Sequence, residues 1–303
     1  MSQRHGSRRV VLTDRDVELF HWLWMLRILT LDQLRRLGYY QPDTGRLSVL
    51  DNVRKRLKRL WDAGYLEGLR LLDSKERVYL LAEAALPALR ERYGIEQRRL
   101  YQPKLEADAQ LLHPLLVSEC AVRFVEATRD TSFELVPLAP LHVPFIQTRL
   151  VEDTSKRRHV ERFVSQEDVP VLGDQPVRIR PDLVCGLEKS GRARLYCIEA
   201  DRDTESPQEL VDKMRGYAHY RTALDPDDPS RRLWQRYGAF QDFRVLIVTT
   251  SERRRENLVQ ALEHQVGWKL VAVTTIERLQ AEHPLRGTIW QNHQGPERAL
   301  VRG

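Results

Sequence analysis

The sequence predicts an α/β protein with two domains, and three observations support this prediction. The chain has 303 residues, which is enough for two hydrophobic cores. Its first third shows three helical patterns and then two short alternating segments, the order of a winged helix-turn-helix. Further on, apolar strand patterns alternate with helical patterns, as in a sheet covered by helices. We therefore expect one domain over residues 1–104 and a second over residues 105–303.

The charge of the chain is unevenly distributed. The net charge is +6, but residues 1–104 hold 21 Lys and Arg against 13 Asp and Glu, whereas residues 105–303 hold 28 against 30. All of the excess positive charge therefore lies in the predicted first domain. Such a distribution indicates a polyanionic partner for that domain.

Composition and motifs argue against several classes of protein. No apolar run approaches the roughly 18 residues of a membrane span, and the first residues lack the apolar stretch of a signal peptide. Cys120, Cys185 and Cys197 form no C-x-x-C pair, so we expect small core residues rather than disulfides or a zinc site. The chain has no phosphate-binding G-x-x-x-x-G-K-[ST] loop. We expect a cytoplasmic protein that has no contact with membranes.

The first domain is predicted to contain three helices and a hairpin. Apolar residues at helical spacing predict the helices, and alternation predicts two short strands around a wing. The predicted segments are a helix over residues 14–28, a helix over residues 30–38, a helix over residues 48–63, and strands over residues 65–70 and 77–81.

The third helix supplies the predicted contact with double-stranded DNA. Leu50, Val53, Leu57 and Leu60 form one apolar stripe, and basic side chains fill the other faces. A solvated basic face would show the same pattern, but its place after two helices and before a hairpin favours nucleic acid. The residues that we expect to contact DNA are Arg54, Lys55, Lys58 and Arg59.

The second domain is predicted to begin with a long helix over residues 107–128. A strand-turn-strand pattern over residues 178–200 follows, and helices and apolar strands then alternate. The later segments are a helix over residues 206–223, a strand over residues 243–250, a helix over residues 251–264 and a strand over residues 269–275. We expect residues 283–303 to form a loosely packed polar tail.

Three acids lie on the predicted hairpin. Asp182 is early on its first strand, and Glu199 and Asp201 end its second strand. Because strand side chains alternate, Glu199 and Asp201 point to one face, and pairing of the strands can bring Asp182 near them. Converging carboxylates repel one another, and a divalent cation relieves that repulsion. Solvated acids at strand ends are the alternative, but Asp182 and Glu199 both lie in apolar surroundings.

The RPD element at residues 180–182, followed by the hairpin and IEADRDTES, resembles the PD-(D/E)xK nuclease core. More narrowly, these residues resemble the replication-relaxation family of plasmid and mobile-element proteins. The resemblance implies a restriction-endonuclease-like αβββαβ domain after the winged helix, with Mg²⁺ or Mn²⁺ bound by Asp182 and Glu199. It also implies a further acid on the preceding helix, for which Glu119 is the candidate.

One position departs from the nuclease pattern, because Asp201 replaces the usual lysine after the second acid. Lys213 lies on the following predicted helix, four residues before Tyr217, and could supply the missing cation. An amphipathic helix with a surface lysine would show the same spacing. Tyr217 or Tyr220 as a covalent nucleophile also stays open.

Two functions fit these residues. The first is a metal-dependent nickase or relaxase-like protein that processes the DNA of a mobile element, as the retained Asp182 and Glu199 favour. The second is a catalytically inactive, nuclease-like fold that serves as a DNA-binding replication or transcription factor, as Asp201 favours. Homodimerisation through the second domain, and replication or mobilisation proteins as partners, are compatible with either function.

Overall fold

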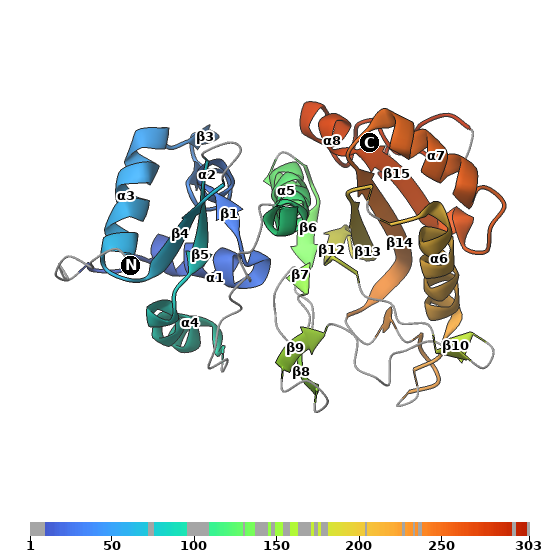
Figure 1. Cartoon of the computed structure of the whole chain (residues 1–303), viewed down its shortest axis with the longest axis horizontal. Helices are drawn as coiled ribbons and strands as arrows, with labels where there is room; N and C mark the ends of the chain where they lie inside the picture. The colour runs from blue at the N-terminus through green and yellow to red at the C-terminus, as the bar shows by residue number, and fades with distance from the viewer. Residues whose placement is uncertain are drawn as a thin grey trace. The chain divides into compact units, whose positions relative to one another are not determined.

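The chain divides into two compact units, Met1–Val122 and Arg123–Gly303, in this computed structural model (Figure 1). The predicted boundary at residue 104 lies outside the described residues. The structure describes residues 10–71, 76–95, 109–129, 131–136, 145–146, 149–153, 158–162, 171–172, 175–176, 181–203, 205–225, 228–232, 234–235, 238–292 and 295–301.

The first unit contains the three predicted helices and the two predicted hairpin strands, so these predictions are confirmed. The strands pair antiparallel in a three-stranded sheet of order β1-β5-β4, while β2 and β3 form a separate short hairpin. The tip of the predicted wing, at residues 72–75, lies outside the described residues. The elements are α1 (Asp14–Leu26), β1 (Leu29–Thr30), α2 (Leu31–Gly38), β2 (Tyr40–Gln41), β3 (Arg46–Leu47), α3 (Leu50–Asp62), β4 (Leu66–Arg70), β5 (Arg77–Leu81), a 3₁₀ turn (Glu83–Ala85) and α4 (Leu86–Tyr93).

Local sequence sets where these helices begin and which face they bury. Thr13 and Thr30 each form a capping box with the residue three positions on, which satisfies backbone N–H groups at the starts of α1 and α2. Helix α3 buries Val53, Leu57 and Leu60 of the predicted stripe completely, whereas Leu50, its first residue, is only partly buried. The basic face of α3 is therefore held outward by an intact apolar stripe.

Asp16 joins the start of α1 to α3. Its side chain is 1% exposed and accepts hydrogen bonds from Thr13 and from Arg56, with Arg56 Nε 3.0 Å from Oδ1. Burial alone would raise the pKa of Asp16, but the hydrogen bonds from Arg56 and Thr13 hold that pKa below its ordinary value of 3.8. Arg56 is thus a structural residue within an otherwise exposed run of basic side chains.

The second unit is built on a six-stranded mixed sheet, which confirms the expected α/β class. The strand order is β15-β14-β13-β12-β6, with β7 also paired to β12. Helix α5 crosses from the first unit into the second. The elements are α5 (Ala109–Arg129), β6 (Glu134–Val136), β7 (Phe145–Ile146), β8 (Arg149–Asp153), β9 (Arg158–Arg162), β10 (Val171–Leu172), β11 (Gln175–Pro176), β12 (Leu183–Lys189), β13 (Arg192–Asp201), α6 (Pro207–Thr222), β14 (Phe240–Thr249), α7 (Glu252–Leu262), a 3₁₀ turn (Trp268–Leu270), β15 (Val271–Thr275) and α8 (Ile276–Ala281).

The predicted hairpin is β12 and β13, joined by a two-residue turn. Ser190 and Gly191 have φ values of 53° and 75°, the left-handed conformations that let Lys189 pair directly with Arg192. The strands predicted over residues 243–250 and 269–275 are confirmed as β14 and β15, and β13, β14 and β15 run parallel to one another. Their carboxyl ends lie at one edge of the sheet, where Asp201, Thr249 and Thr275 are in register.

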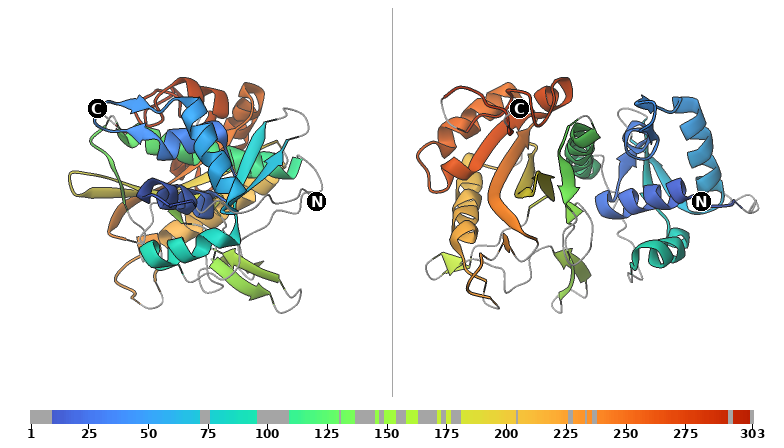
Figure 2. Two further views of the ribbon diagram at one scale, coloured as in Figure 1. Left: turned by 90° about the vertical axis from the view of Figure 1, so that its left-hand side faces the viewer. Right: turned by 180° about the vertical axis from the view of Figure 1, so that it is seen from behind.

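Helices cover both faces of this sheet within the second unit. Helices α6 and α7 lie together on one face in the views of Figures 1 and 2, and the main core lies between them and the sheet. On the other face, Phe124 of α5 contacts Tyr196 of β13, with ring centroids 6.3 Å apart. All three cysteines are buried free thiols, as expected of core residues. In the part of the chain that the structure describes, no helix has the length and apolarity to cross a bilayer.

The expectation of a loosely packed C-terminal tail is wrong. Leu285, Ile289 and Trp290 are at most 2% exposed, and the Trp290 indole donates to the carbonyl of Pro284 at 2.8 Å. Gln291 pairs with Val273 on the outer edge of β15. A few apolar residues in a polar segment thus extend the core and cover a sheet edge, which composition alone did not reveal.

We predict that Asp16→Asn lowers the free energy of unfolding by about 3 kcal/mol at pH 7, because it leaves the partly buried Arg56 without its acid. The contribution of Asp16 is present above pH 3.8, its ordinary pKa, and is lost as the pH falls through the lower pKa of the folded protein. The difference between wild type and variant should therefore shrink in acid. Urea unfolding at several pH values measures it.

The matched control is Asp62→Asn, because Asp62 forms an exposed ion pair with Lys58 on the same helix α3. Exposed pairs of this kind contribute about 0.5 kcal/mol or less. Equal effects of the two substitutions would contradict the structural role of Asp16.

Candidate functional site

Four polar side chains meet near the carboxyl end of β13. We call Asp182, Glu199, Lys213 and Tyr217 the acid–lysine cluster. Asp182 directly precedes β12, and its Oδ2 accepts a hydrogen bond from the backbone N–H of Ala200 at 2.9 Å. The pairing of Leu183 with Ile198 places Asp182 beside Glu199. The hairpin therefore brings these two predicted site residues together.

Glu199 is the buried centre of this cluster. Its side chain is 2% exposed, Lys213 Nζ lies 2.6 Å from Oε2, and the Tyr217 hydroxyl donates to Oε1. Lys213 and Tyr217 lie on one face of α6 because they are four residues apart. Ser206 and Glu209 form a capping box that starts α6 directly after the β13 loop. The predicted Lys213 thus faces the second acid from α6.

The cluster changes the ionisation of its members. Burial raises the pKa of Glu199 to about 8, with the Lys213 ammonium acting in the opposite direction and Asp182 adding to the rise. Burial would lower the pKa of Lys213, but Glu199, Asp182 and Glu205 together raise it. Burial and Glu199 raise the pKa of Tyr217 well above its ordinary value. Lys213 is therefore a fixed cation, and Glu199 is a carboxyl group that is costly to ionise.

Asp201 lies on the same face of β13 but has different partners. Arg254 of α7 binds it with two nitrogens, Nε at 2.8 Å from Oδ2 and Nη2 at 3.1 Å from Oδ1. Thr249 Oγ1 also donates to Oδ2 at 3.0 Å. One guanidinium thus binds both carboxylate oxygens of Asp201, whereas the two oxygens of Glu199 contact two different side chains, Lys213 and Tyr217. The position of the usual lysine is occupied by an acid paired to an arginine.

Sequence reasoning missed Arg254, which also contacts Asp203 and the carbonyl of Glu205. It holds the loop between β13 and α6, and Glu205 of this loop lies 3.6 Å from Lys213. In the sequence, Arg254 is the middle of three consecutive arginines on a polar helix, so nothing marked it as buried. The spacing along α7 is the one indication of its burial: Arg254 is four residues before the buried Leu258, so both lie on the same face of the helix.

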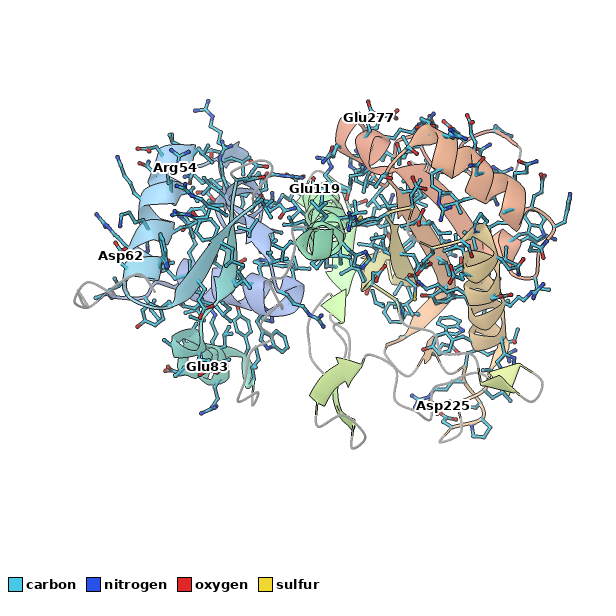
Figure 3. The ribbon with its side chains drawn as sticks, viewed as in Figure 1. Arg54, Asp62, Glu83, Glu119, Asp225 and Glu277 are labelled. Atoms are coloured by element: carbon cyan, nitrogen blue, oxygen red, sulfur yellow. The ribbon has the colours of Figure 1, made fainter. Side chains whose placement is uncertain are left out.

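Glu119 has partners within the first unit. Gln33 Nε2 donates to its Oε2 at 3.1 Å, and Arg36 Nη1 lies 2.9 Å from Oε1. Glu119 lies on α5, where Figure 3 labels it, and its residue is 8% exposed. The structure therefore pairs this predicted site residue with α2 and does not show it among the members of the acid–lysine cluster.

The four predicted DNA-binding residues all lie on the exposed face of α3. The side chains of Arg54, Lys55 and Lys58 are 57%, 70% and 67% exposed, and Arg59 is also exposed. Figure 3 marks α3 with Arg54 near one end and Asp62 near the other. Their contacts with Asp51 and Asp62 are exposed pairs within one helix, which are weak and salt-sensitive. These cations can exchange such partners for phosphates.

The tyrosines proposed as covalent nucleophiles are not accessible. Tyr217 is 0% exposed and Tyr220 is 2% exposed, both within the core between the sheet and α6. A nucleophile must approach the phosphorus atom directly, and a buried phenol cannot do so. In this conformation Tyr217 orients Glu199.

The site can be tested for its fit to a divalent cation. Among the described residues, no three His, Cys, Asp or Glu side chains form a metal-binding group. Asp182 and Glu199 do offer two adjacent carboxylates, the hard oxygen ligands that Mg²⁺ and Mn²⁺ take. Glu199 Oε2 accepts no well-aligned hydrogen bond from the described residues, and its contact with Lys213 is an ion pair. The donor chemistry of these two acids therefore fits a divalent cation.

Comparison with known proteins assigns the family. A sequence model described as replication-relaxation matches residues 20–232, most of the chain, including α3 and the acid–lysine cluster. The chain belongs to the replication-relaxation family, as its motifs predicted. This membership indicates a role in replication or in the processing of mobile-element DNA. No curated protein and no solved structure matched the chain.

We predict that Lys213→Met makes stability more sensitive to pH. An acid whose pKa rises on folding, as that of Glu199 does from 4.5 to about 8, lowers stability as the pH increases across that interval. Lys213 stays protonated throughout and opposes this loss. Without its ammonium the pKa of Glu199 should rise further, so the free energy of unfolding should fall by up to about 1 kcal/mol more between pH 5 and pH 8.5 than in wild type.

The control is the double variant Lys213→Met with Glu199→Gln, which has no titrating group at this position. Its stability should change little over the same interval, as measured by denaturant unfolding at each pH. Parallel pH profiles for wild type and the single variant would show that Lys213 does not stabilise the Glu199 carboxylate.

Proposed function

We propose that this protein binds double-stranded DNA and nicks or processes it by metal-dependent phosphodiester cleavage, in replication or mobilisation of a mobile element. The observation that supports this most is the buried Glu199 carboxylate beside Asp182, with Lys213 Nζ 2.6 Å from it. This proposal makes the acid–lysine cluster the catalytic centre.

Burial of this ion pair is difficult to explain by stability alone. Replacing a buried ion pair by apolar residues is often neutral or stabilising, since desolvation offsets the attraction of the charges. Glu199 adjoins a large apolar core, where a hydrophobic residue would pack well. A strongly perturbed carboxyl group with a specific charged partner is instead typical of catalytic sites.

Each residue of the cluster has a role in this proposal. Asp182 and Glu199 would hold Mg²⁺ or Mn²⁺, which when bound activates water and stabilises the leaving oxygen. Lys213 presents a fixed positive charge that stabilises the negative charge developing on the phosphate. Tyr217 orients Glu199 through its hydroxyl. Asp201, bound by Arg254, keeps the loop between β13 and α6 in place and is a positioning residue.

DNA binding is assigned to the first unit. Its helices α1, α2 and α3 and its hairpin β4–β5 follow the order of a winged helix-turn-helix, in which the third helix enters the major groove. The exposed Arg54, Lys55, Lys58 and Arg59 are the proposed contacts. The positive charge of the first third supports the same role.

A second candidate function is supported by Asp201. Its two oxygens are bound by Arg254, so the usual lysine position is occupied by a structural ion pair. In this alternative, the second unit has lost catalysis, and the protein is a DNA-binding replication or transcription factor. Incubation with supercoiled plasmid and Mn²⁺, with and without chelator, tests the two candidates. Chelator-sensitive nicking that Glu199→Gln abolishes supports the enzyme, and its absence supports the factor.

We predict that a variant with Arg54, Lys55, Lys58 and Arg59 all changed to Gln loses most duplex affinity. The slope of log K against log salt should become shallower by about one unit for each lost phosphate contact. Fluorescence anisotropy at several salt concentrations measures both quantities.

The control carries the same charge change at exposed arginines outside α3, namely Arg90, Arg215, Arg253 and Arg286. It should retain most of the affinity. Equal losses in the two variants would indicate a general charge effect and would contradict the role of α3.

We predict that Mn²⁺ raises the melting temperature of wild type and that Asp182→Asn or Glu199→Gln abolishes this increase. Each change removes one ligand charge with little change in volume, and a ligand that binds only the folded state stabilises it. Asp212→Asn, an exposed acid on α6, is the control and should keep the increase. Duplex binding should persist in all three variants. An unchanged Mn²⁺ effect in both site variants would remove the metal from the proposed mechanism.

A further inference from the structure

Three arginines of the second unit converge on a single acid. We call Arg194, Arg221, Arg244 and Asp242 the arginine cluster. Arg194 Nε and Arg244 Nε lie 3.1 Å and 3.4 Å from Asp242 Oδ2, and Arg221 Nη2 lies 3.7 Å from Oδ1. The four residues come from β13, β14 and the end of α6, so the sheet and its covering helix fix their positions.

The single carboxylate is insufficient for three guanidinium groups. Asp242 Oδ1 also accepts the backbone N–H of Phe243 at 2.8 Å, which uses part of its acceptor capacity. Each guanidinium has five N–H donors, and the backbone takes few of them: Arg244 donates to the carbonyl of Lys269, and Arg194 to that of Leu300. Arg194 also donates to the Tyr196 hydroxyl at 3.5 Å, and among the described residues the cluster has a charge of +2 and more N–H donors than the acceptors that contact it.

The exposure of these side chains is intermediate. Arg194, Arg221 and Arg244 are 38%, 43% and 38% exposed, so solvent or a ligand can reach each guanidinium. The rest of the unit does not explain the local charge, because residues 123–303 hold 28 Lys and Arg against 27 Asp and Glu. Three like charges repel one another unless an anion offsets them. An excess positive charge is therefore concentrated at one place in a nearly neutral unit.

This place differs from the acid–lysine cluster. Arg194 and Asp242 are paired near the amino ends of β13 and β14, whereas Glu199 is near the carboxyl end of β13. Arg194 is five residues before Glu199 on β13, roughly 16 Å along the strand. Arg221 is eight residues after Lys213 on α6, about 12 Å along the helix. The arginine cluster can therefore contribute to affinity but does not reach the proposed reacting atoms.

We propose that the arginine cluster is a second contact for nucleic acid and binds its phosphodiester backbone. Guanidinium groups form paired hydrogen bonds to phosphate oxygens, and three partly exposed guanidinium groups held at one place concentrate such donors. The role of Asp242 is to hold the arginines together while leaving a positive surplus. This surface is independent of α3 and would hold DNA against the second unit.

The decisive experiment is Asp242→Asn in the full chain, because the two explanations of the cluster predict opposite results. If the cluster binds phosphate, removing the acid raises its charge by one. Duplex affinity should then increase, and the slope of log K against log salt should become steeper by up to about one unit. If the arginines serve only to hold the fold through Asp242, the variant loses stability and gains no affinity, which overturns the proposal.

A second variant decides the matter if Asp242→Asn does not fold. Arg194, Arg221 and Arg244 are changed together to Gln in a chain whose four α3 residues are already neutral, so that only the remaining affinity is measured. This affinity should fall, and the salt slope should become shallower by up to about three units. The control changes Arg215, Arg253 and Arg286, which are exposed on α6, on α7 and after α8.

The outcomes separate this surface from the function proposed for α3. Loss of the remaining affinity only in the cluster variant supports the proposal, even if α3 proves unimportant. Equal affinity in the cluster variant and its control overturns it. Inorganic phosphate is tested in parallel by its competition with duplex. If phosphate binds to wild type and not to the cluster variant while duplex affinity is equal in both, the cluster is a site for a small anion and the nucleic-acid assignment fails.

Discussion

Burial of the Glu199 carboxyl group is the constraint on which the placement of α6 in the second unit depends. Glu199 is almost fully buried, and burying an isolated carboxylate carries a large unfavourable free energy. Contacts with Lys213 and Tyr217 of α6 offset this free energy. The same helix buries Leu210 and Met214 in the core against β14 and α7. The polar contacts with Glu199 and the apolar contacts with the core therefore favour the same position of α6.

Two acids on one face of β13 show how neighbours separate the roles of similar residues. Glu199 meets an ammonium and a phenol, neither of which binds both of its oxygens in the paired geometry of a guanidinium. Asp201 meets Arg254, which does bind both oxygens. Glu199 can therefore exchange partners more readily than Asp201 can. That contrast supports Glu199 as a ligand or catalytic acid and Asp201 as a positioning residue.

Local pattern in the sequence was sufficient for the main helices and strands of both units and for the meeting of Asp182, Glu199 and Lys213. A two-residue turn with Gly191 determines the register of β12 and β13, and spacing along α6 determines which side chains face the sheet. The pairing of Arg254 with Asp201 and of Arg56 with Asp16 joins positions 53 and 40 residues apart, and no periodicity encodes such pairs. The same limit explains Glu119, whose partners on α2 precede it by more than 80 residues, and the buried Trp290.

Counts of charged residues along the sequence predict the charge of a surface only after the ion pairs formed within the protein are subtracted. Arg56 belongs to the basic run of α3, yet its guanidinium is used by Asp16, so the helix presents fewer free cations than its composition suggests. The second unit shows the reverse, since its nearly equal totals conceal three arginines that share one acid. A polyanion responds to the charge that remains at a given place after internal pairing, because screening limits the reach of distant charges to about 10 Å at ordinary ionic strength. On that physical ground, a nearly neutral unit can still hold DNA locally.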